Sequence, residues 1–361
     1  MKKITLDWTI FFLTFGLILF GLVMIYNTSS VSALNDFNNP YFYLKEQATF
    51  VLLGLGIIFF MAFFDYHKLY YLSLPGIIIT ILCLIAVFLP GIGVGTMGAH
   101  RWLNLGFTTI QPAEMAKLAV IIYLSAWFSG QEKGRLAAFL VLFGLIISLI
   151  MVEPDMGTTM IIALIFLILY FLSGAPWKHF LFILPLGITG IFAAVKIAPY
   201  RFERWLTFLD STRDLLGKSY HINQVLIAIG SGGLLGLGLG KSRQKYAYLP
   251  EATTDSIFAI IAEELGFIGC LFLLLIFAAL FYKMFQVAHN APDRFGRLLG
   301  FGICVYLITQ TLVNLGAMTV VIPLTGVPLP FISYGGSALL VEMASIGIML
   351  NISSHEKQNG K

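Results

Sequence analysis

Four short segments carry ionisable or backbone-breaking residues inside otherwise apolar surroundings. They are residues 111–117, 153–157, 249–255 and 323–337, and Asn314 precedes the last of them. Charged groups in apolar surroundings are costly to bury and are by default functional hypotheses. We therefore expect the chemistry of the chain to reside in these four segments.

Asp255 is the strongest candidate for an acid–base residue. It stands where a basic stretch, residues 199–255, meets a long apolar run. Its carboxylate suits either the N-cap of the following helix or a base at the boundary of the apolar region. Glu263 and Glu264 follow in the same run and, at about 100° per residue, point in different directions. We expect them to make separate helix-to-helix hydrogen bonds.

The basic stretch before Asp255 offers cations that suit a phosphate group, because charge-assisted bonds to phosphate are strong. Its cationic residues are Arg201, Arg204, Arg213, Lys218, Lys241, Arg243 and Lys245. Residues 225–237 of the stretch are apolar and rich in glycine, which favours a re-entrant or interfacial turn. A loop of this length is uncommon unless it has a function.

Two of the segments allow both a structural and a functional interpretation. Glu114 and Lys117 share one helix face, so they form either a self-neutralising ion pair or the lining of a cavity. Glu153 and Asp155 flank a helix break, where they could hold a cation or a substrate, and where Asp155 could be an N-cap. The sequence leaves these alternatives open.

The fourth segment cannot be a continuous helix. Residues 323–337 contain three prolines and three glycines. Irregular backbone at membrane depth is tolerated only where protein buries it or where it lines a cavity. We expect this segment to belong to a substrate-binding region.

The composition identifies the elements that must position these residues. Of 361 residues, 58% are hydrophobic and 11% are charged, whereas soluble domains have about 25% charged residues. This excludes a soluble enzyme, a disordered chain and a nucleic-acid-binding domain. Cys83, Cys270 and Cys304 all lie in apolar runs, so they indicate neither a disulfide framework nor a zinc site.

A transmembrane helix needs about 20 mostly apolar residues, and the chain holds about ten such runs. They lie near residues 8–27, 47–64, 69–89, 112–129, 136–152, 156–173, 179–198, 256–282, 298–319 and 332–351. We predict an all-α polytopic membrane protein with a single domain over residues 1–361, since β-barrel strands would alternate apolar and polar residues. The first run resembles a signal peptide, but we expect it to remain as the first helix because nine runs follow.

Basic residues in the short loops predict the orientation of the spans. With the N-terminus inside, the short outer loops hold only Lys45 and Arg101. The cytoplasmic side holds Lys2, Lys3, Lys68, Lys133, Arg135, Lys178, Lys283, Arg294, Arg297, Lys357 and Lys361. Both termini are therefore predicted to be cytoplasmic, and residues 199–255 to form one long extracytoplasmic loop between the seventh and eighth spans.

The four segments, in this order, resemble the SEDS family (shape, elongation, division and sporulation), which includes FtsW, RodA and SpoVE. The most specific part is Gly-Val-Pro-Leu-Pro-Phe-Ile-Ser-Tyr-Gly-Gly-Ser at residues 326–337, which is close to the family signature. Further support comes from residues 248–255 with 261–266, from Arg101-Trp102 with residues 111–117, and from residues 153–157. The resemblance covers nearly the whole chain.

Within the family, residues 245–251 and 22–26 are more similar to the division-type FtsW branch than to the RodA branch. The chain also departs from the family pattern. The family usually has His at the position of Thr254, Phe at Ser256, Gln at His221 and a small, glycine-like residue at Val320, while Gln224 keeps a usual glutamine.

The resemblance implies a peptidoglycan glycosyltransferase that polymerises lipid II at the outer face of the bacterial cytoplasmic membrane, at the septum of dividing cells. It implies as partners lipid II, a class B penicillin-binding protein that supplies the transpeptidase, and other membrane proteins of the division complex, with no nucleic acid. The acceptor sugar hydroxyl attacks the anomeric carbon, undecaprenyl pyrophosphate leaves, and the inverting reaction needs a base near that hydroxyl.

We expect Asp255 to be that base. The residues expected to bind the substrate are Arg101, Glu114, Lys117, Asp155, Arg201, Arg204, Gln224, Lys241, Arg243, Glu251, Ser333 and Tyr334. A divalent cation, Mg²⁺ or Mn²⁺, is expected to share the pyrophosphate charge, although the sequence shows no cluster of ligands for it.

Three alternatives to a division polymerase stay open: a RodA-type elongation polymerase, a flippase that moves lipid II across the membrane, and a non-catalytic scaffold. Transporters often contain inverted repeats with paired broken helices near the bilayer midplane. This sequence shows no such pairing, and its polar residues concentrate on the outer side. Surface chemistry is therefore favoured over translocation.

Overall fold

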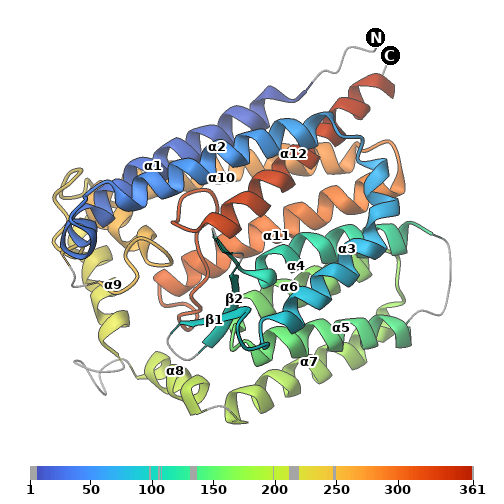
Figure 1. Ribbon diagram of the computed structural model, residues 1–361, viewed down its shortest axis with the longest axis horizontal. Coiled ribbons are helices and arrows are strands. Elements are labelled where there is room, and N and C mark those ends of the chain that lie inside the picture. Colours follow the sequence, from blue (N-terminus) through green and yellow to red (C-terminus); the bar gives the residue numbers. More distant parts are fainter. Residues whose placement is uncertain are drawn as a thin grey trace.

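The computed structural model describes residues 6–96, 99–104, 106, 108–130, 136–197, 199–210, 219–246 and 249–359. In these residues the chain forms twelve helices and three short strands (Figure 1). The helices are α1 (Trp8–Phe37), α2 (Phe42–Phe63), α3 (His67–Ala86), α4 (Pro112–Ser129), α5 (Leu136–Val152), α6 (Met156–Leu172), α7 (Trp177–Ile197), α8 (Pro199–Leu209), α9 (Tyr220–Gly232), α10 (Ile257–His289), α11 (Arg294–Met318) and α12 (Gly336–Asn359).

Each of the ten predicted apolar runs corresponds to a helix, namely α1–α7 and α10–α12. Helices α4 and α5 begin and end at the predicted residues, and Pro112 occupies the first turn of α4, where its missing N–H costs nothing. Among the described residues, six helices are long and apolar enough to cross a membrane: α1, α2, α3, α10, α11 and α12. Helices α5 and α6 are apolar but shorter. The chain is thus a helical membrane protein, while the number of ten spans stays a prediction.

Helices α11 and α12 form the centre of the bundle. Within their apolar windows 72% and 89% of the residues are buried, compared with 22% for α10. Helix α12 packs against α2, α4 and α10, and α11 packs against α4, α6 and α10 (Figure 1). Polar side chains on α11 and α12 are therefore inside the protein, where each needs a partner.

A small antiparallel sheet is an addition to the predicted all-α fold, which is otherwise helical. Strands β1 (Gly93–Thr96), β2 (Ala99–Asn104) and β3 (Thr109–Ile110) pair in that order, and the β1–β2 register shifts between Val94 and Gly95. The strands are too short to give a clear alternating pattern in the sequence. The sheet matters for the site because β2 carries Arg101.

The predicted loop at residues 199–255 is partly helical, because it contains α8 and α9. Residues 211–218 and 247–248 of this stretch, with Arg213 and Lys218, lie outside the described residues. The glycine-rich part of the stretch ends α9 at Gly232 and continues as turns.

Helix α10 is broken at Gly266, whose φ of 66° and ψ of −168° are not helical. Four backbone hydrogen bonds of 2.9–3.2 Å join residues 233–238 to residues 263–268 across this break. A Cβ atom on Gly266 would lie 2.3 Å from the backbone nitrogen of Gly236, so only glycine permits this approach. The glycine-rich turns therefore pack into the kink of α10.

The start of α1 and the end of α12 lie at the same end of the bundle (Figure 1). The backbone N–H of Asp7 donates to Ser353 Oγ at 3.2 Å. Of the basic residues used to predict the orientation, Lys2, Lys3, Lys133, Arg135 and Lys361 lie outside the described residues. The cytoplasmic location of the termini stays a prediction.

Candidate active site

Asp255 lies in the turns directly before α10, at a junction of two loops. Ser333 Oγ donates to the carbonyl oxygen of Thr254 at 2.5 Å, and the N–H of Tyr334 donates to the carbonyl oxygen of Thr253 at 2.9 Å. Asn314 Nδ2 of α11 donates to the carbonyl oxygen of Asp255 at 2.8 Å. The proline-rich segment and α11 thus hold the backbone around Asp255 in place.

The carboxylate of Asp255 does not cap α10, so the capping alternative for this residue was wrong. The N-cap of α10 is Ser256, and no side chain there makes a capping hydrogen bond. Asp255 Oδ1 accepts a long hydrogen bond of 3.4 Å from Thr254 Oγ1, and within the described residues Asp255 forms no ion pair. A buried carboxyl with so few partners has hydrogen-bonding capacity left for a substrate.

Burial first, and then the nearby negative charge of Glu251, raise the pKa of Asp255 to about 7, against the opposing charge of Arg204. The Asp255 residue is 8% exposed. A general base is most effective when its pKa lies near the working pH. Asp255 therefore has the properties of a base that exchanges protons at neutral pH.

The two segments that meet at Asp255 contain strained backbone. Glu251 has φ of 50° and Phe331 has φ of 64°, in the left-handed region that side-chain-bearing residues rarely adopt. Between them, a Cβ on Gly326 (φ 72°) would lie 3.9 Å from Asp255 Oδ2. Strain of this kind persists only where the surrounding structure enforces it, and it clusters at functional sites.

A buried ion pair on α4 connects to the proline-rich segment through Gln310. Lys117 Nζ lies 2.8 Å from Glu114 Oε2 and donates to Gln310 Oε1 at 2.7 Å. The same ammonium lies 5.0 Å from the centre of the Tyr306 ring. Glu114 is 4% exposed and Lys117 is fully buried, so the pair neutralises itself inside the protein.

Gln310 and Glu342 carry this network to the proline-rich segment. Gln310 Nε2 donates to Glu342 Oε1 at 2.8 Å and to the carbonyl oxygen of Pro328 at 3.2 Å. Glu342 Oε2 accepts from the N–H of Phe331 at 2.8 Å. The polar interior of α4, α11 and α12 therefore holds the proline-rich segment at Pro328 and at the strained residue Phe331.

The turn between α5 and α6 approaches the same segment. Asp155 is the N-cap of α6: Oδ1 accepts from the N–H of Thr158 at 2.9 Å, and Gln111 Nε2 donates to Oδ2 at 3.2 Å. The capping role of Asp155 is confirmed. A Cβ on Gly157 would lie 3.0 Å from the carbonyl oxygen of Thr325, so the first turn of α6 packs directly on the proline-rich segment.

Arg101 and Glu153 complete this turn. The Arg101 guanidinium donates to the carbonyl oxygens of Glu153 at 2.9 Å and Pro154 at 2.6 Å. Both carboxyl oxygens of Glu153 are buried and have no hydrogen-bond partner in the described residues. Burial, and then the charge of Asp155, raise the pKa of Glu153 to about 8, against the opposing charge of Arg101. Glu153 is therefore a neutral acid at pH 7.

The predicted phosphate-binding cations fall into two classes. Arg201 is buried and donates to the carbonyl oxygen of Met151 at 2.7 Å, which ties α8 to the end of α5. Arg204 is exposed, donates to the carbonyl oxygen of Leu324 at 3.4 Å, and is close enough to Asp255 to oppose the increase in its pKa. Lys241 and Arg243 are also exposed.

Glu263 and Glu264 hold the segment that carries Lys241 and Arg243. Glu263 accepts from the N–H of Arg243 at 3.0 Å and from the Ser242 hydroxyl. Glu264 accepts from the N–H groups of Gly240 and Ser242 at 3.0 and 3.1 Å and pairs with Lys245 Nζ at 3.4 Å. Glu264 also accepts from Asn27 Nδ2 of α1 at 2.5 Å. Within the described residues, the bond to Asn27 is the one helix-to-helix bond of the kind we expected. Both glutamates otherwise bind the segment at residues 240–245, because it folds back over the first turns of α10.

Four predicted residues remain: Glu251, Ser333, Tyr334 and Gln224. Glu251 is exposed and accepts from Thr254 Oγ1 at 2.8 Å. Ser333 is buried in the loop junction, and Tyr334 donates its hydroxyl to Glu46 Oε2 of α2 at 2.6 Å. Gln224 is half-buried on α9. Their binding roles stay predictions.

Three of the four departures from the family pattern, His221, Ser256 and Val320, have a local structural feature. His221 Nε2 lies 2.8 Å from Ser256 Oγ, and burial lowers the pKa of His221. Val320 has φ of 55°, which accounts for the glycine-like residue usual in the family. Two of the positions that depart from the family pattern, His221 and Ser256, are therefore in direct contact.

Sequence reasoning missed Gln310 and Glu342. The signal was available, because both are polar residues inside long apolar runs, Gln310 in the run near 298–319 and Glu342 in the run near 332–351. Their partners could not be predicted, since these come from different helices.

Comparison with known proteins places the chain among bacterial cell wall proteins. It is 37% identical to Stage V sporulation protein E of Bacillus subtilis (strain 168) over 99% of both chains. It is 35% identical to the probable peptidoglycan glycosyltransferase FtsW of Geobacter sp. (strain M18) over 93% of both.

Two solved structures are similar over the whole fold. A chain from a study of polymerization and crosslinking by a peptidoglycan synthase complex matches with a TM-score of 0.81 and 29% identity, covering 99% of this chain and 100% of that chain. The rod shape determining protein RodA of Thermus thermophilus matches with a TM-score of 0.71 and 28% identity, covering 97% of both chains. A model of the FtsW/RodA/SpoVE family, described as "Cell cycle protein", matches residues 7–358. The chain belongs to the FtsW/RodA/SpoVE family, the SEDS family of integral membrane proteins.

Proposed function

We propose that this chain is a peptidoglycan glycosyltransferase that polymerises lipid II at the outer face of the cytoplasmic membrane. The observation that carries the proposal is Asp255, a buried carboxyl with a pKa of about 7 that has few hydrogen-bond partners and lies near the exposed cation Arg204. The relatives named as probable peptidoglycan glycosyltransferases, at up to 37% identity, support the same activity.

In the proposed reaction, Asp255 accepts the proton of the acceptor 4-hydroxyl as its oxygen attacks the anomeric carbon of a second lipid II molecule. One glycosidic bond forms, the bond from the anomeric carbon to the pyrophosphate breaks, and undecaprenyl pyrophosphate leaves with the bonding electrons. Positioned proton transfer of this kind is worth about 10²–10⁴-fold in rate. The strained loops around Asp255 fix its position. Holding a catalytic group in place beforehand lowers the entropic part of the activation barrier.

The leaving pyrophosphate requires positive charge. Arg204, Lys241 and Arg243 are exposed, whereas Arg201 is buried and bonded to backbone. We therefore assign the pyrophosphate to the three exposed cations and a structural role to Arg201. An arginine can bind a phosphate with two parallel hydrogen bonds, which adds orientation to charge.

A divalent cation fits this site if the substrate supplies most of its ligands. Mg²⁺ is commonly held by one or two carboxylates together with phosphates and water. Glu251 is exposed and its negative charge raises the pKa of Asp255, so the two carboxyls lie near one another. Glu251 would hold the ion, and the bound ion would neutralise charge on the departing pyrophosphate.

The proposal places Asp255 at the outer membrane boundary. It includes ten membrane spans, cytoplasmic termini and an outer stretch at residues 199–255, as the distribution of basic residues predicts. Asp7 and Ser353 lie together at one end of the bundle, which supports a common side for both termini. The lipid tail would then stay in the bilayer while the sugars remain in water.

The partner is proposed to be a class B penicillin-binding protein. A similar chain comes from a peptidoglycan synthase complex that couples polymerization to crosslinking, which supports such a partner. Similar relatives include sporulation, division and rod-shape proteins. We propose the division role, with assembly at the septum alongside other division proteins, because residues 245–251 and 22–26 are similar to the FtsW branch.

The experiment is polymerisation by the purified chain, co-expressed with its class B partner, on lipid II with Mg²⁺ or Mn²⁺. A penicillin blocks crosslinking, so that glycan ladders on a gel report polymerisation alone. We expect ladders from the wild type and none from Asp255→Ala. If an intact complex gives no ladders, a liposome assay for lipid II translocation tests the flippase alternative.

A further inference from the structure

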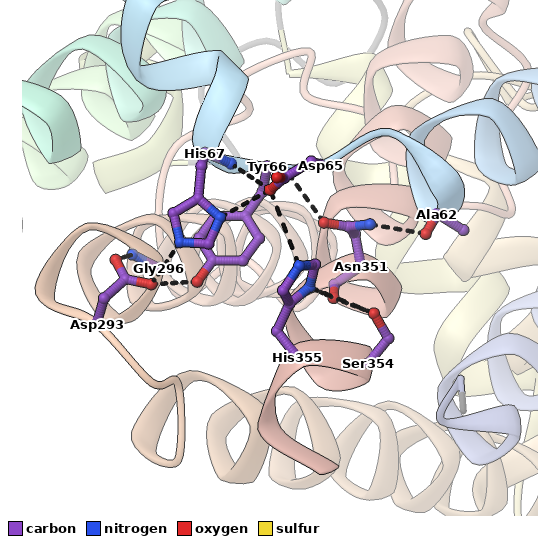
Figure 2. A network of polar contacts seen from close by, with 9 residues as sticks. All are labelled: Ala62, Asp65, Tyr66, His67, Asp293, Gly296, Asn351, Ser354 and His355. Carbon is purple, nitrogen blue, oxygen red and sulfur yellow. Dashed lines mark hydrogen bonds and ion pairs between the residues drawn. The ribbon is translucent and has the colours of Figure 1, made fainter. Parts of the chain in front are cut away.

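A second polar cluster lies at the opposite end of α10, α11 and α12 from Asp255. It joins the turn between α2 and α3, which carries Asp65 and His67, to the end of α12, which carries His355 (Figure 2). Asp293, the N-cap of α11, borders it. The proposed function makes no use of this cluster.

Asp65 and the two histidines direct potential ligand atoms at one another. His67 Nδ1 lies 2.7 Å from Asp65 Oδ1, and His355 Nε2 lies 3.9 Å from the same oxygen. Within the part of the chain that the structure describes, this is the one group of at least three His, Cys, Asp or Glu residues whose ligand atoms all lie within 4.8 Å. Sequence reasoning missed it because its members are almost 300 residues apart.

The second nitrogen of each ring faces a separate hydrogen-bond acceptor. His67 Nε2 lies 3.2 Å from Asp293 Oδ2, and His355 Nδ1 lies 3.0 Å from the carbonyl oxygen of Asn351 (Figure 2). Metal-binding histidines almost always donate this second N–H to a carboxylate or a backbone carbonyl. Those acceptors orient each ring with its other nitrogen toward Asp65. A metal ion that binds there would displace the proton shared by His67 Nδ1 and Asp65 Oδ1, which lie 2.7 Å apart.

The acceptors are themselves held in place. Asp293 accepts from the Tyr66 hydroxyl and from the N–H of Gly296 at 2.8 Å. Asn351 Oδ1 accepts from the N–H of Tyr66 at 2.9 Å, and Asn351 Nδ2 donates to the carbonyl oxygen of Ala62 at 2.8 Å. Tyr66 and Asn351 are buried, so this shell is as rigid as the core.

We propose that Asp65, His67 and His355 bind a zinc ion, with water completing a tetrahedral site. Two imidazoles favour zinc and similar transition metals over Mg²⁺ or Ca²⁺, which prefer oxygen ligands. The side chains of Asp65 and His67 are 46% and 48% exposed, which gives an entering ion and its water access. A bound ion would join the α2–α3 turn to α12 and stabilise this end of the bundle.

The test uses the full chain in detergent, freed of its affinity tag and dialysed against a chelator. Titration with Zn²⁺ against a chromogenic competitor measures stoichiometry and affinity, independently of polymerase activity. We expect one Zn²⁺ per chain, with that site lost in His67→Ala and in His355→Ala. The matched control is His289→Ala, an exposed histidine at the end of α10, which should bind as the wild type does.

Asp293→Asn tests the orientation of His67. The Asn oxygen can still accept from the N–H of Gly296 and cap α11. The Asn NH₂ group then replaces Oδ2, and it cannot accept a proton from His67 Nε2. We expect the affinity for Zn²⁺ to fall about 10- to 100-fold, as for other residues that orient a ligand. Zn²⁺ should raise the melting temperature of the wild type and leave that of His67→Ala unchanged.

Two results would overturn the zinc site. One is the absence of a stoichiometric Zn²⁺ in the wild type, which would make the cluster a set of histidine–carboxylate ion pairs. The other is equal loss of binding in His67→Ala and His289→Ala, which would indicate non-specific binding. If His67→Ala melts far below the wild type without metal, His355→Gln replaces it in the comparison.

Discussion

The pH dependence of polymerisation follows from the environment of Asp255. Burial and the charge of Glu251 raise its pKa to about 7, whereas an ordinary aspartate has a pKa near 3.9. At pH 6 a base with a pKa of 7 is about 9% ionised, and at pH 8 about 91%. The rate at pH 6 should therefore be roughly a tenth of the rate at pH 8. An ordinary aspartate would give almost no change over this range.

Two variants that each remove one charge should move this profile in opposite directions. Glu251→Gln removes a negative charge that raises the pKa of Asp255, so the midpoint should shift to lower pH when the divalent ion is saturating and stays bound through the substrate phosphates. Arg204→Gln removes a positive charge that lowers the pKa, so the midpoint should shift to higher pH. The quantity to compare is the pH at which the polymerisation rate is half-maximal. The maximal rate is not compared, because both residues are also candidates for substrate binding.

The assay is the initial rate of lipid II consumption at pH 5–9 for the wild type and both variants, with the class B partner present. Ionisation of the substrate pyrophosphate would produce a midpoint common to all three proteins. The assignment is refuted if the two midpoints coincide with the wild-type value, or if they move in the same direction.

Three further predictions concern stability, measured as melting temperature in detergent. Lys117→Met leaves the Glu114 carboxylate buried and unpaired, which costs about 3–5 kcal/mol, and Lys117→Met with Glu114→Gln should restore most of it. Val320→Gly relieves a positive φ and should stabilise by about 0.5–1 kcal/mol, whereas Val321→Gly should destabilise. Asp255→Asn should stabilise more at pH 8 than at pH 5, because a carboxyl with a raised folded-state pKa destabilises the fold increasingly as pH rises toward 7.

Much of the fold could be predicted from the sequence because apolar runs report helix length directly. The predicted bounds of α4 and α5 match the structure, since Pro112 and polar residues end those runs sharply. The break at Gly266 could not be predicted, because the run around it stays apolar and the reason for the break is the distant segment 233–238. The short strands near Arg101 were missed for lack of a repeating pattern.

The sequence allowed Asp255 to be chosen as the candidate base, but it did not indicate which residues hold the site in place. Asp255 could be identified because it is a carboxylate at the boundary between a basic stretch and an apolar run, and both features can be read from neighbouring residues. The path from Lys117 through Gln310 to Glu342 depends on three helices packing together, which no spacing along the chain indicates. For the same reason the sequence could not separate exposed Arg204 from buried Arg201.

The central claim is that Asp255 is the base for glycan polymerisation. The most direct measurement is the initial rate of lipid II polymerisation by wild type and Asp255→Asn, each in complex with the class B partner, together with lipid II binding. We expect a rate lower by about 10²–10⁴-fold, with lipid II binding essentially unchanged. A variant that folds, binds its partner and polymerises lipid II within threefold of the wild-type rate would contradict it.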